Sequence, residues 1–196
     1  MTATLTASGR LRALCADDWE RLHQHPFVRA LADGTLPVDA FRFYLEQNLQ
    51  FLSEYARAIG FGAGRAPDLA TLRAFGAALA NVVESEIPQN EELLAQTIAL
   101  GARDLGGAEA MAPATLAYTS FLVATAATDG SLALMAAILP RGWSSDDFDR
   151  CAADVDDETM ERLASLCAEG ARLQLDFWDM AHRLEHWPDV RARHPL

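Results

Sequence analysis

Long apolar runs and cysteines are both scarce in this sequence of 196 residues. A membrane-spanning helix needs about 18 apolar residues in succession. No segment reaches that length, so we expect none to cross a membrane. The opening residues show no apolar run preceded by basic charge, so a signal peptide is not expected. The three cysteines, Cys15, Cys151 and Cys167, lack CxxC spacing, which is typical of reduced thiols in a cytoplasmic protein.

Positive charge is also scarce. The chain has 16 Lys and Arg residues against 28 Asp and Glu residues, which gives a formal net charge of -12 at pH 7. Nucleic acids and anionic membranes bind basic surfaces, and the sequence has no basic stripe or tail. We therefore expect neither nucleic acid nor membrane as a partner. The acidic excess is interpreted as a solubility feature.

Histidine is missing from the middle of the chain. A di-iron site in a helical bundle needs Glu-x-x-His pairs on facing helices, and that pattern is absent. No Gly-rich phosphate loop, GxSxG elbow or H-E-x-x-H motif is present. The sequence therefore predicts no metal and no cofactor, and disfavours a haem ligand. The five histidines are His23, His25, His182, His186 and His194.

Apolar residues are plentiful and recur mostly at helical spacing. They make up 51% of the chain, enough for a sizeable core, and strand-like alternation is scarce. No repeat, low-complexity tract or linker divides the sequence. We therefore predict a single all-α domain over residues 1–196, with flexible tails at 1–8 and 188–196.

The same spacing predicts where the helices lie. Ser8 would cap the first helix, and Pro88 is expected to kink the third long segment. Residues 141–156 are polar and give no clear prediction. The predicted segments are a helix over 8–24, a short turn over 27–32, a helix from Pro37 to the glycines at 60–64, a helix beginning after Asp68, and helices over 113–128, from 131 to about 140, and over 158–187.

A few polar side chains interrupt the apolar faces of the predicted helices. A buried polar group without a partner costs about 1–3 kcal/mol, so each of them needs a partner or a ligand. They could form a satisfied internal network or surround a small-molecule pocket. Arg141, which follows the apolar run 136–140, could reach the same centre. The four residues, each on a different predicted helix, are Asn48, Glu86, Tyr118 and Gln174.

Glu86 is the strongest single candidate, because a buried carboxylate needs a cation or hydrogen-bond donors. Arg141 is its candidate partner, either in a structural salt bridge or at the polar end of a pocket that holds an anionic ligand. Aromatic side chains on the same faces could stack on a planar ring. Phe51 is the first of these, because it lies one turn from Asn48. Tyr44 and Phe177 are further candidates.

Several segments carry a family resemblance. Residues 19–58 read WERLHQHPFVRALADGTLPVDAFRFYLEQNLQFLSEYARA, and NVVESEIPQN, PATLAYTSFL, LALMAAILPRGW and DFWDMAHRLEHW follow in order. In these segments the sequence resembles the TenA family, thiaminase II and its relatives, over residues 19–187. The resemblance implies a haem-oxygenase-like helical bundle without haem, and a homo-oligomer, either a dimer or a tetramer.

The resemblance also implies an activity. Members of the family hydrolyse thiamin or an aminopyrimidine breakdown product of it, without a metal. A cysteine after an LLP run attacks the pyrimidine ring. Here Arg141 follows Ile138, Leu139 and Pro140, so an arginine stands at the position of that nucleophile. Of the family's other site positions, Tyr118 matches a tyrosine, whereas Asn48 replaces an aspartate, Phe51 and Ser145 replace tyrosines, and Gln174 replaces a glutamate.

These differences predict a divergent member of the family. A guanidinium cannot serve as the nucleophile, and Asn and Gln side chains transfer no protons near neutral pH. One reading is an aminopyrimidine-binding or weakly hydrolysing protein of thiamin-pyrimidine metabolism, with Glu86 as the catalytic acid or base. The alternative is a non-catalytic or repurposed protein for an acidic ligand held by Arg141. The predicted ligand-binding residues are Tyr44, Asn48, Phe51, Tyr118, Arg141, Gln174 and Phe177.

Overall fold

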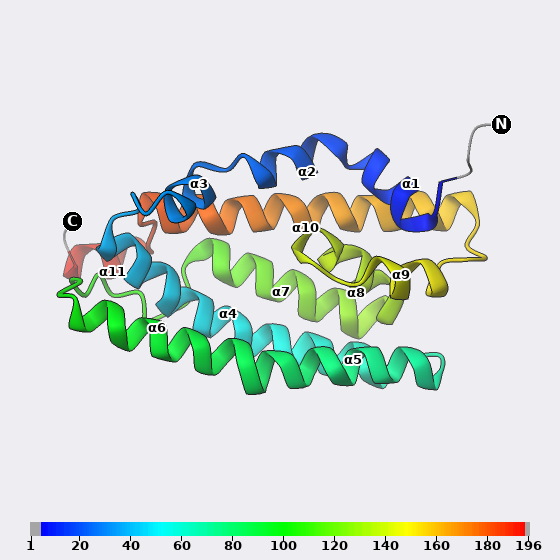
Figure 1. The fold of residues 1–196 in the computed structure, drawn as a ribbon, viewed down its shortest axis with the longest axis horizontal. Helices are drawn as coiled ribbons and strands as arrows, with labels where there is room; N and C mark the ends of the chain where they lie inside the picture. The colour runs from blue at the N-terminus through cyan, green and yellow to red at the C-terminus, as the bar shows by residue number, and fades with distance from the viewer. Residues whose placement is uncertain (1–4, 195–196) are drawn as a thin grey trace.

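The computed structural model describes residues 5–194, and every regular element in that range is a helix (Figure 1). The all-α prediction is therefore confirmed. Within the same range, no helix has the length and hydropathy needed to cross a membrane. The elements are α1 (Ala7–Leu14), α2 (Ala16–His23), α3 (Pro26–Ala32), α4 (Val38–Gly64), α5 (Leu69–Asn81), the π turn η1 (Val82–Glu86), α6 (Ile87–Ala99), α7 (Pro113–Thr128), α8 (Ser131–Ile138), the short 3-10 helix η2 (Leu139–Arg141), α9 (Ser145–Cys151), α10 (Asp157–Arg183) and α11 (Pro188–Arg193).

Helix α4 lies inside the bundle. Helices α5 and α6 run along one side of it, and α7, α8 and α10 also pack against it. Helices α1, α2 and α3 lie along α10 (Figure 1). Large side chains from most of these helices fill the core between them. The bulkiest fully buried ones are Phe27, Phe43, Phe51, Phe75, Tyr118, Phe148 and Phe177.

The first predicted helix is divided in two. The chain leaves helical geometry at Cys15, with φ -113° and ψ 23°, so the prediction of one helix over 8–24 is wrong. Thr6, rather than Ser8, caps α1 by accepting a hydrogen bond from the backbone N–H of Gly9. Ser8 instead donates from its hydroxyl to Asp149, at 2.9 Å. The break allows α1 to contact both α9 and α10 while α2 follows α10 alone.

The helix after Asp68 begins as predicted, with the Asp68 carboxylate accepting from the N–H of Thr71 at 2.7 Å. The disturbance expected at Pro88 takes the form of the π turn η1, in which the N–H of Ile87 bonds to the carbonyl of Val82, five residues back. Proline has no N–H, so the α-helical bond at Pro88 cannot form. A wider turn just before it is one way in which a helix accommodates such a defect.

Residues 188–194 fold against the bundle, whereas we expected a flexible tail over 188–196, of which residues 195 and 196 lie outside the described range. Helix α10 ends earlier than predicted, at Arg183, because Leu184 adopts a left-handed conformation with φ 55°. Helix α11 then buries Val190, which is 5% exposed. Arg193 pairs with Glu109 at 2.7 Å, and the indole N–H of Trp187 donates to the carbonyl of Met111 at 2.8 Å.

Gly170 is the point where α10 approaches α8 most tightly. A Cβ at this position would overlap the backbone carbonyl of Ala137, which has no freedom to move aside. We expect Gly170→Ala to lower the free energy of unfolding by about 2 kcal/mol or more. Gly60→Ala is the matched control, because a Cβ at that helical position meets no atom within 4 Å.

Urea denaturation of both variants tests this expectation. Gly60→Ala should be neutral or stabilise the protein by up to about 1 kcal/mol, since alanine favours helix. Equal stability of the two variants would show that the α8–α10 contact is not close enough to require glycine.

Candidate functional site

The predicted ligand-binding residues meet around one cavity of about 210 Å³, which we call the first cavity. They come from α4, α7, η2 and α10, which lie far apart in sequence. Trp178, which was not predicted, completes the wall. The residues lining the cavity are Tyr44, Asn48, Phe51, Tyr118, Arg141, Gln174, Phe177 and Trp178.

Aromatic rings form the greater part of the first cavity. Phe51 lies among them and is 2% exposed. Its ring centroid is 4.9 Å from that of Tyr118 and 5.5 Å from that of Phe177. Tyr44 meets the edge of Phe177 at 6.0 Å. Such walls favour a flat, apolar-faced ligand.

Polar atoms in the first cavity are only partly satisfied by the protein. Asn48 donates from Nδ2 to Oδ1 of Asn90 at 2.9 Å. Gln174 and Tyr118 are 8% and 1% exposed, yet neither side chain makes a hydrogen bond within the described part of the chain. Burial raises the pKa of the Tyr118 hydroxyl well above its usual value, so it remains protonated. Because buried polar groups are normally hydrogen-bonded, these atoms are available to a ligand or to water.

Arg141 enters the cavity from η2 and lies against aromatic faces. Its guanidinium carbon is 4.6 Å from the ring centre of Tyr55 and 5.2 Å from that of Phe51. Burial lowers the pKa of Arg141, but the neighbouring Tyr55, Tyr118 and Glu86 groups outweigh that effect and raise it. Arg141 is therefore permanently charged.

Glu86 does not line the first cavity. It lies on the π turn η1, where one carboxylate oxygen accepts from Nδ2 of Asn81 at 2.9 Å. The other oxygen lies 3.4 Å from a guanidinium nitrogen of Arg141. The sequence left open whether Arg141 pairs with Glu86 or binds a ligand. In the structure Arg141 pairs with Glu86 and also lines the first cavity.

Glu86 instead borders a neighbouring cavity of about 280 Å³, which we call the second cavity. Tyr55, Trp143 and Asp147 also line it. The indole N–H of Trp143 is buried there and has no hydrogen-bond partner among the described residues. Arg141 belongs to the walls of both cavities, so the Arg141–Glu86 pair lies at the boundary between them.

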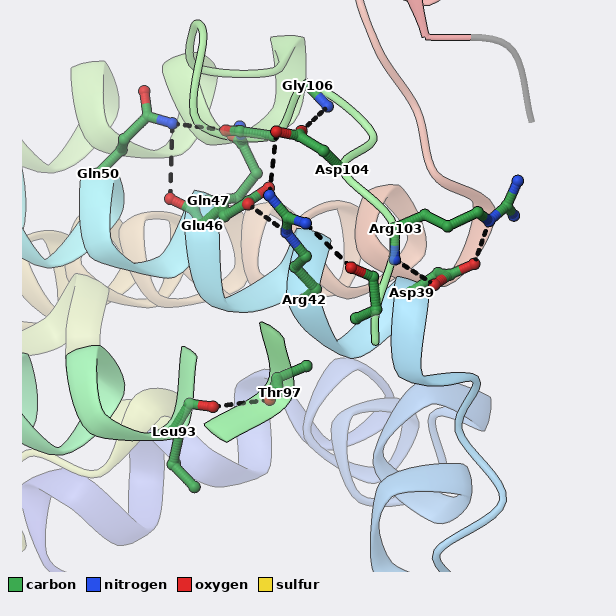
Figure 2. Close-up of polar contacts among 12 residues, drawn as sticks. Asp39, Arg42, Glu46, Gln47, Gln50, Leu93, Thr97, Arg103, Asp104 and Gly106 are labelled. Carbon is green, nitrogen blue, oxygen red and sulfur yellow. Dashed lines mark hydrogen bonds and ion pairs between the residues drawn. The ribbon is translucent and has the colours of Figure 1, made fainter. Parts of the chain in front are cut away.

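Gln47 is an important residue that the sequence analysis missed. Its side chain is fully buried and faces the loop before α7 (Figure 2). Nε2 donates to the carbonyls of Gly107 and Ala110, at 2.5 and 2.9 Å. Oε1 accepts from the N–H of Ala112 and the hydroxyl of Thr115, at 2.8 and 2.6 Å. The available signal was a run of polar residues, Glu46, Gln47 and Asn48, within an otherwise apolar part of the predicted helix.

Further contacts hold the same loop (Figure 2). Arg42 donates to the carbonyl of Ala102 at 3.0 Å and pairs with Glu46 at 2.8 Å. Gln50 donates to the carbonyl of Gly107 at 2.8 Å. Together with Gln47, these residues fix the start of α7 and hence the position of Tyr118.

No cysteine lines either cavity, although all three lie in the described part of the chain. Cys15 and Cys167 are buried in the core, and Cys151 lies at the end of α9. Within residues 5–194, no group of three His, Cys, Asp or Glu side chains is placed to hold a metal ion.

Comparison with known proteins supports the resemblance drawn from the sequence. Residues 15–146 match the model of the TENA/THI-4/PQQC family. The aminopyrimidine aminohydrolase of Halalkalibacterium halodurans is 28% identical, over 86% of this chain and 92% of the relative. The enzyme of the same name from Bacillus subtilis is 24% identical, over 93% of this chain and 92% of the relative.

A solved structure agrees in fold. A TenA homologue from P. horikoshii OT3 superposes with a TM-score of 0.75 at 22% sequence identity, covering 91% of this chain and 99% of the homologue. The likeness confirms the haem-oxygenase-like fold that the resemblance implied.

The four hydrogen bonds of Gln47 lead to a stability prediction. We expect Gln47→Leu to lower the free energy of unfolding by about 2–4 kcal/mol, because it leaves buried backbone groups without partners. Gln50→Leu is the matched control on the same helix, since Gln50 is only half-buried and makes fewer contacts. We expect it to cost about 1 kcal/mol or less.

Urea denaturation with circular dichroism compares the two variants. If Gln47→Leu cost no more than Gln50→Leu, Gln47 would not be the residue that attaches the loop to α4.

Proposed function

We propose that this chain, which belongs to the TENA/THI-4/PQQC family, binds an aminopyrimidine in its first cavity as part of thiamin-pyrimidine metabolism. The observation that carries the proposal is a cavity between aromatic rings into which Gln174 and Tyr118 bring polar groups that make no hydrogen bond to other described residues. The relatives named aminopyrimidine aminohydrolases supply the class of ligand. A homo-oligomer and a cytoplasmic location stay predictions.

The size of the first cavity fits a single ring. Pockets for drug-sized ligands have volumes of about 300–1,000 Å³. The first cavity has about 210 Å³, which suits one substituted pyrimidine better than a two-ring ligand.

The polar groups suit the edge of an aminopyrimidine. Such an edge presents an amino donor beside a ring-nitrogen acceptor. A carboxamide matches it, because its oxygen accepts while its NH₂ donates. Gln174 has both groups available, and Asn48 retains its side-chain oxygen. The Tyr118 hydroxyl supplies a further donor, and Phe51 and Phe177 would cover the ring faces.

Catalysis is the finer part of the proposal. With Arg141 at the nucleophile's position, we infer that the usual thiaminase chemistry is lost. Weak hydrolysis would then use Glu86 as the base for a water in the second cavity, acting on a group of the ligand that reaches the boundary near Arg141. The 3.4 Å contact of Glu86 with Arg141 supports this arrangement only in part, because it occupies one carboxylate oxygen.

A second candidate function follows from Arg141. It is a cation in the wall of a cavity lined mainly by aromatic residues, and its single ion pair within the described residues is the 3.4 Å contact with Glu86. Its remaining N–H groups could bind a carboxylate or phosphate. Thermal-shift screening separates the two functions. Stabilisation by anionic metabolites but not by pyrimidines would favour the second.

Tyr118→Phe tests the binding proposal. Removing the hydroxyl should weaken aminopyrimidine binding about two- to tenfold, the value of one hydrogen bond of about 0.5–1.5 kcal/mol. Tyr55→Phe is the matched control, because Tyr55 lines only the second cavity. Isothermal titration calorimetry measures both. Equal losses in the two variants, or no binding by the unmodified protein, would count against the first cavity as the site.

Glu86→Gln tests the catalytic part. At high enzyme concentration we expect slow release of formate from a formyl-aminopyrimidine, reduced at least about 100-fold in Glu86→Gln because the amide cannot act as a base. Aminopyrimidine affinity should change little, since Glu86 lies outside the first cavity. No turnover by the unmodified protein would remove the catalytic proposal and leave the binding proposal standing.

A further inference from the structure

We propose that the first cavity binds its aminopyrimidine in the uncharged form and excludes positively charged rings, thiamin among them. The inference rests on the proposed function and adds the charge state of the ligand. Thiamin carries a permanent positive charge on its thiazolium ring, whereas an aminopyrimidine is charged only when a ring nitrogen is protonated.

The first step is the charge of the walls. Among the described residues that line the first cavity, none is an aspartate or glutamate, and Arg141 is the only charged one. A like charge close by disfavours a cation strongly when water is largely excluded. A cationic ring would therefore meet repulsion without a compensating carboxylate.

The second step is the direction of the Arg141–Glu86 pair. Arg141 borders both cavities, whereas Glu86 borders only the second. The pair therefore contributes only its positive member to the wall of the first cavity and both members to the wall of the second. Asp147 adds another carboxylate to the second cavity. Glu86 does not line the first cavity, so it weakens the repulsion between Arg141 and a cationic ligand only through its pairing with the guanidinium.

The third step concerns the groups that would contact a ring edge. Asn48 and Gln174 stand where the family resemblance implies carboxylates, and both are neutral amides. Amides hydrogen-bond a neutral ring edge well but supply no negative charge. The Tyr44 and Tyr118 hydroxyls also stay neutral, because burial raises the pKa of each.

The remaining titratable groups near the cavity lie behind its wall. His25 packs against Trp178 at 5.6 Å, and its Nε2 lies 3.4 Å from Asp179. Burial lowers the pKa of His25 despite Asp179, which favours the neutral imidazole at pH 7. His25 and Asp179 border a separate groove rather than the first cavity. We therefore expect the affinity to depend on the protonation of the ligand rather than on that of a protein group.

The experiment measures binding of an aminopyrimidine by calorimetry at pH values above and below the ligand's own ring-nitrogen pKa. Ultraviolet titration of the free ligand gives that pKa. We expect the affinity to fall about tenfold per pH unit below it, because only the neutral form binds. The ring-N-methylated analogue, which is cationic at every pH, should bind at least about tenfold more weakly than the neutral aminopyrimidine does, with an affinity that does not change with pH. The charge of this analogue does not change with pH. Any pH dependence of its binding would therefore report the titration of a protein group such as His25.

Gln174→Glu provides the converse test. It adds a carboxylate to the first cavity with little change of shape, at a side chain that makes no hydrogen bond within the described residues. We expect the variant to bind the cationic analogue about tenfold more tightly than the unmodified protein does, with a weaker dependence on pH. Gln89→Glu is the matched control, because it adds the same charge at an exposed position of α6 and should change neither property.

The outcomes separate the two proposals. Equal binding of the cationic analogue, or affinity that rises as the ligand becomes protonated, would overturn the charge inference and leave the proposed function intact. Absence of aminopyrimidine binding at every pH would overturn both.

Discussion

The enclosure of α4 by other helices is the constraint on which most of the structure depends. Because α5, α6, α7, α8 and α10 all pack against it, three successive polar side chains of α4, those of Glu46, Gln47 and Asn48, are buried. Each must bond to protein or border a cavity. Gln47 and Asn48 are neighbours that illustrate the two outcomes. Gln47 is fully satisfied by the loop before α7, whereas Asn48 faces the first cavity, so one helix both fixes the scaffold and forms the site.

The Arg141–Glu86 pair lies where the two cavities meet. Arg141 lines both cavities, whereas the carboxylates of Glu86 and Asp147 line only the second. The guanidinium packs on Phe51 and Tyr55 at the position where the resemblance implies a nucleophilic cysteine. An aromatic cavity is retained around a group that cannot attack a ring. A cavity suited to the ligand class of the family therefore does not by itself imply the family's reaction in this chain.

The π turn before Pro88 connects the helical hydrogen bond that is lost at this proline to the Arg141–Glu86 pair. Proline prevents one helical hydrogen bond, and the wider turn at Val82–Glu86 takes up the change. Glu86 is the last residue of that turn. Its backbone carbonyl accepts from Asn90 at 2.8 Å, and Asn90 in turn binds Asn48. The turn is thereby connected to the wall of the first cavity as well as to Arg141. Such turns recur at functional sites in helical proteins.

The sequence by itself determined the helical class and the boundaries of α4 and α7, because helical periodicity reports which positions are buried. Periodicity together with the family resemblance also indicated every residue that lines the first cavity except Trp178. The sequence did not determine the break at Cys15 or the docking of α11, which depend on contacts with distant segments. Periodicity also assigned Glu86 to the same centre as Asn48. Only the tertiary structure decided that Glu86 borders a different cavity and that Arg141 stands between the two, because side chains on separate helices acquire their distances only when the helices pack.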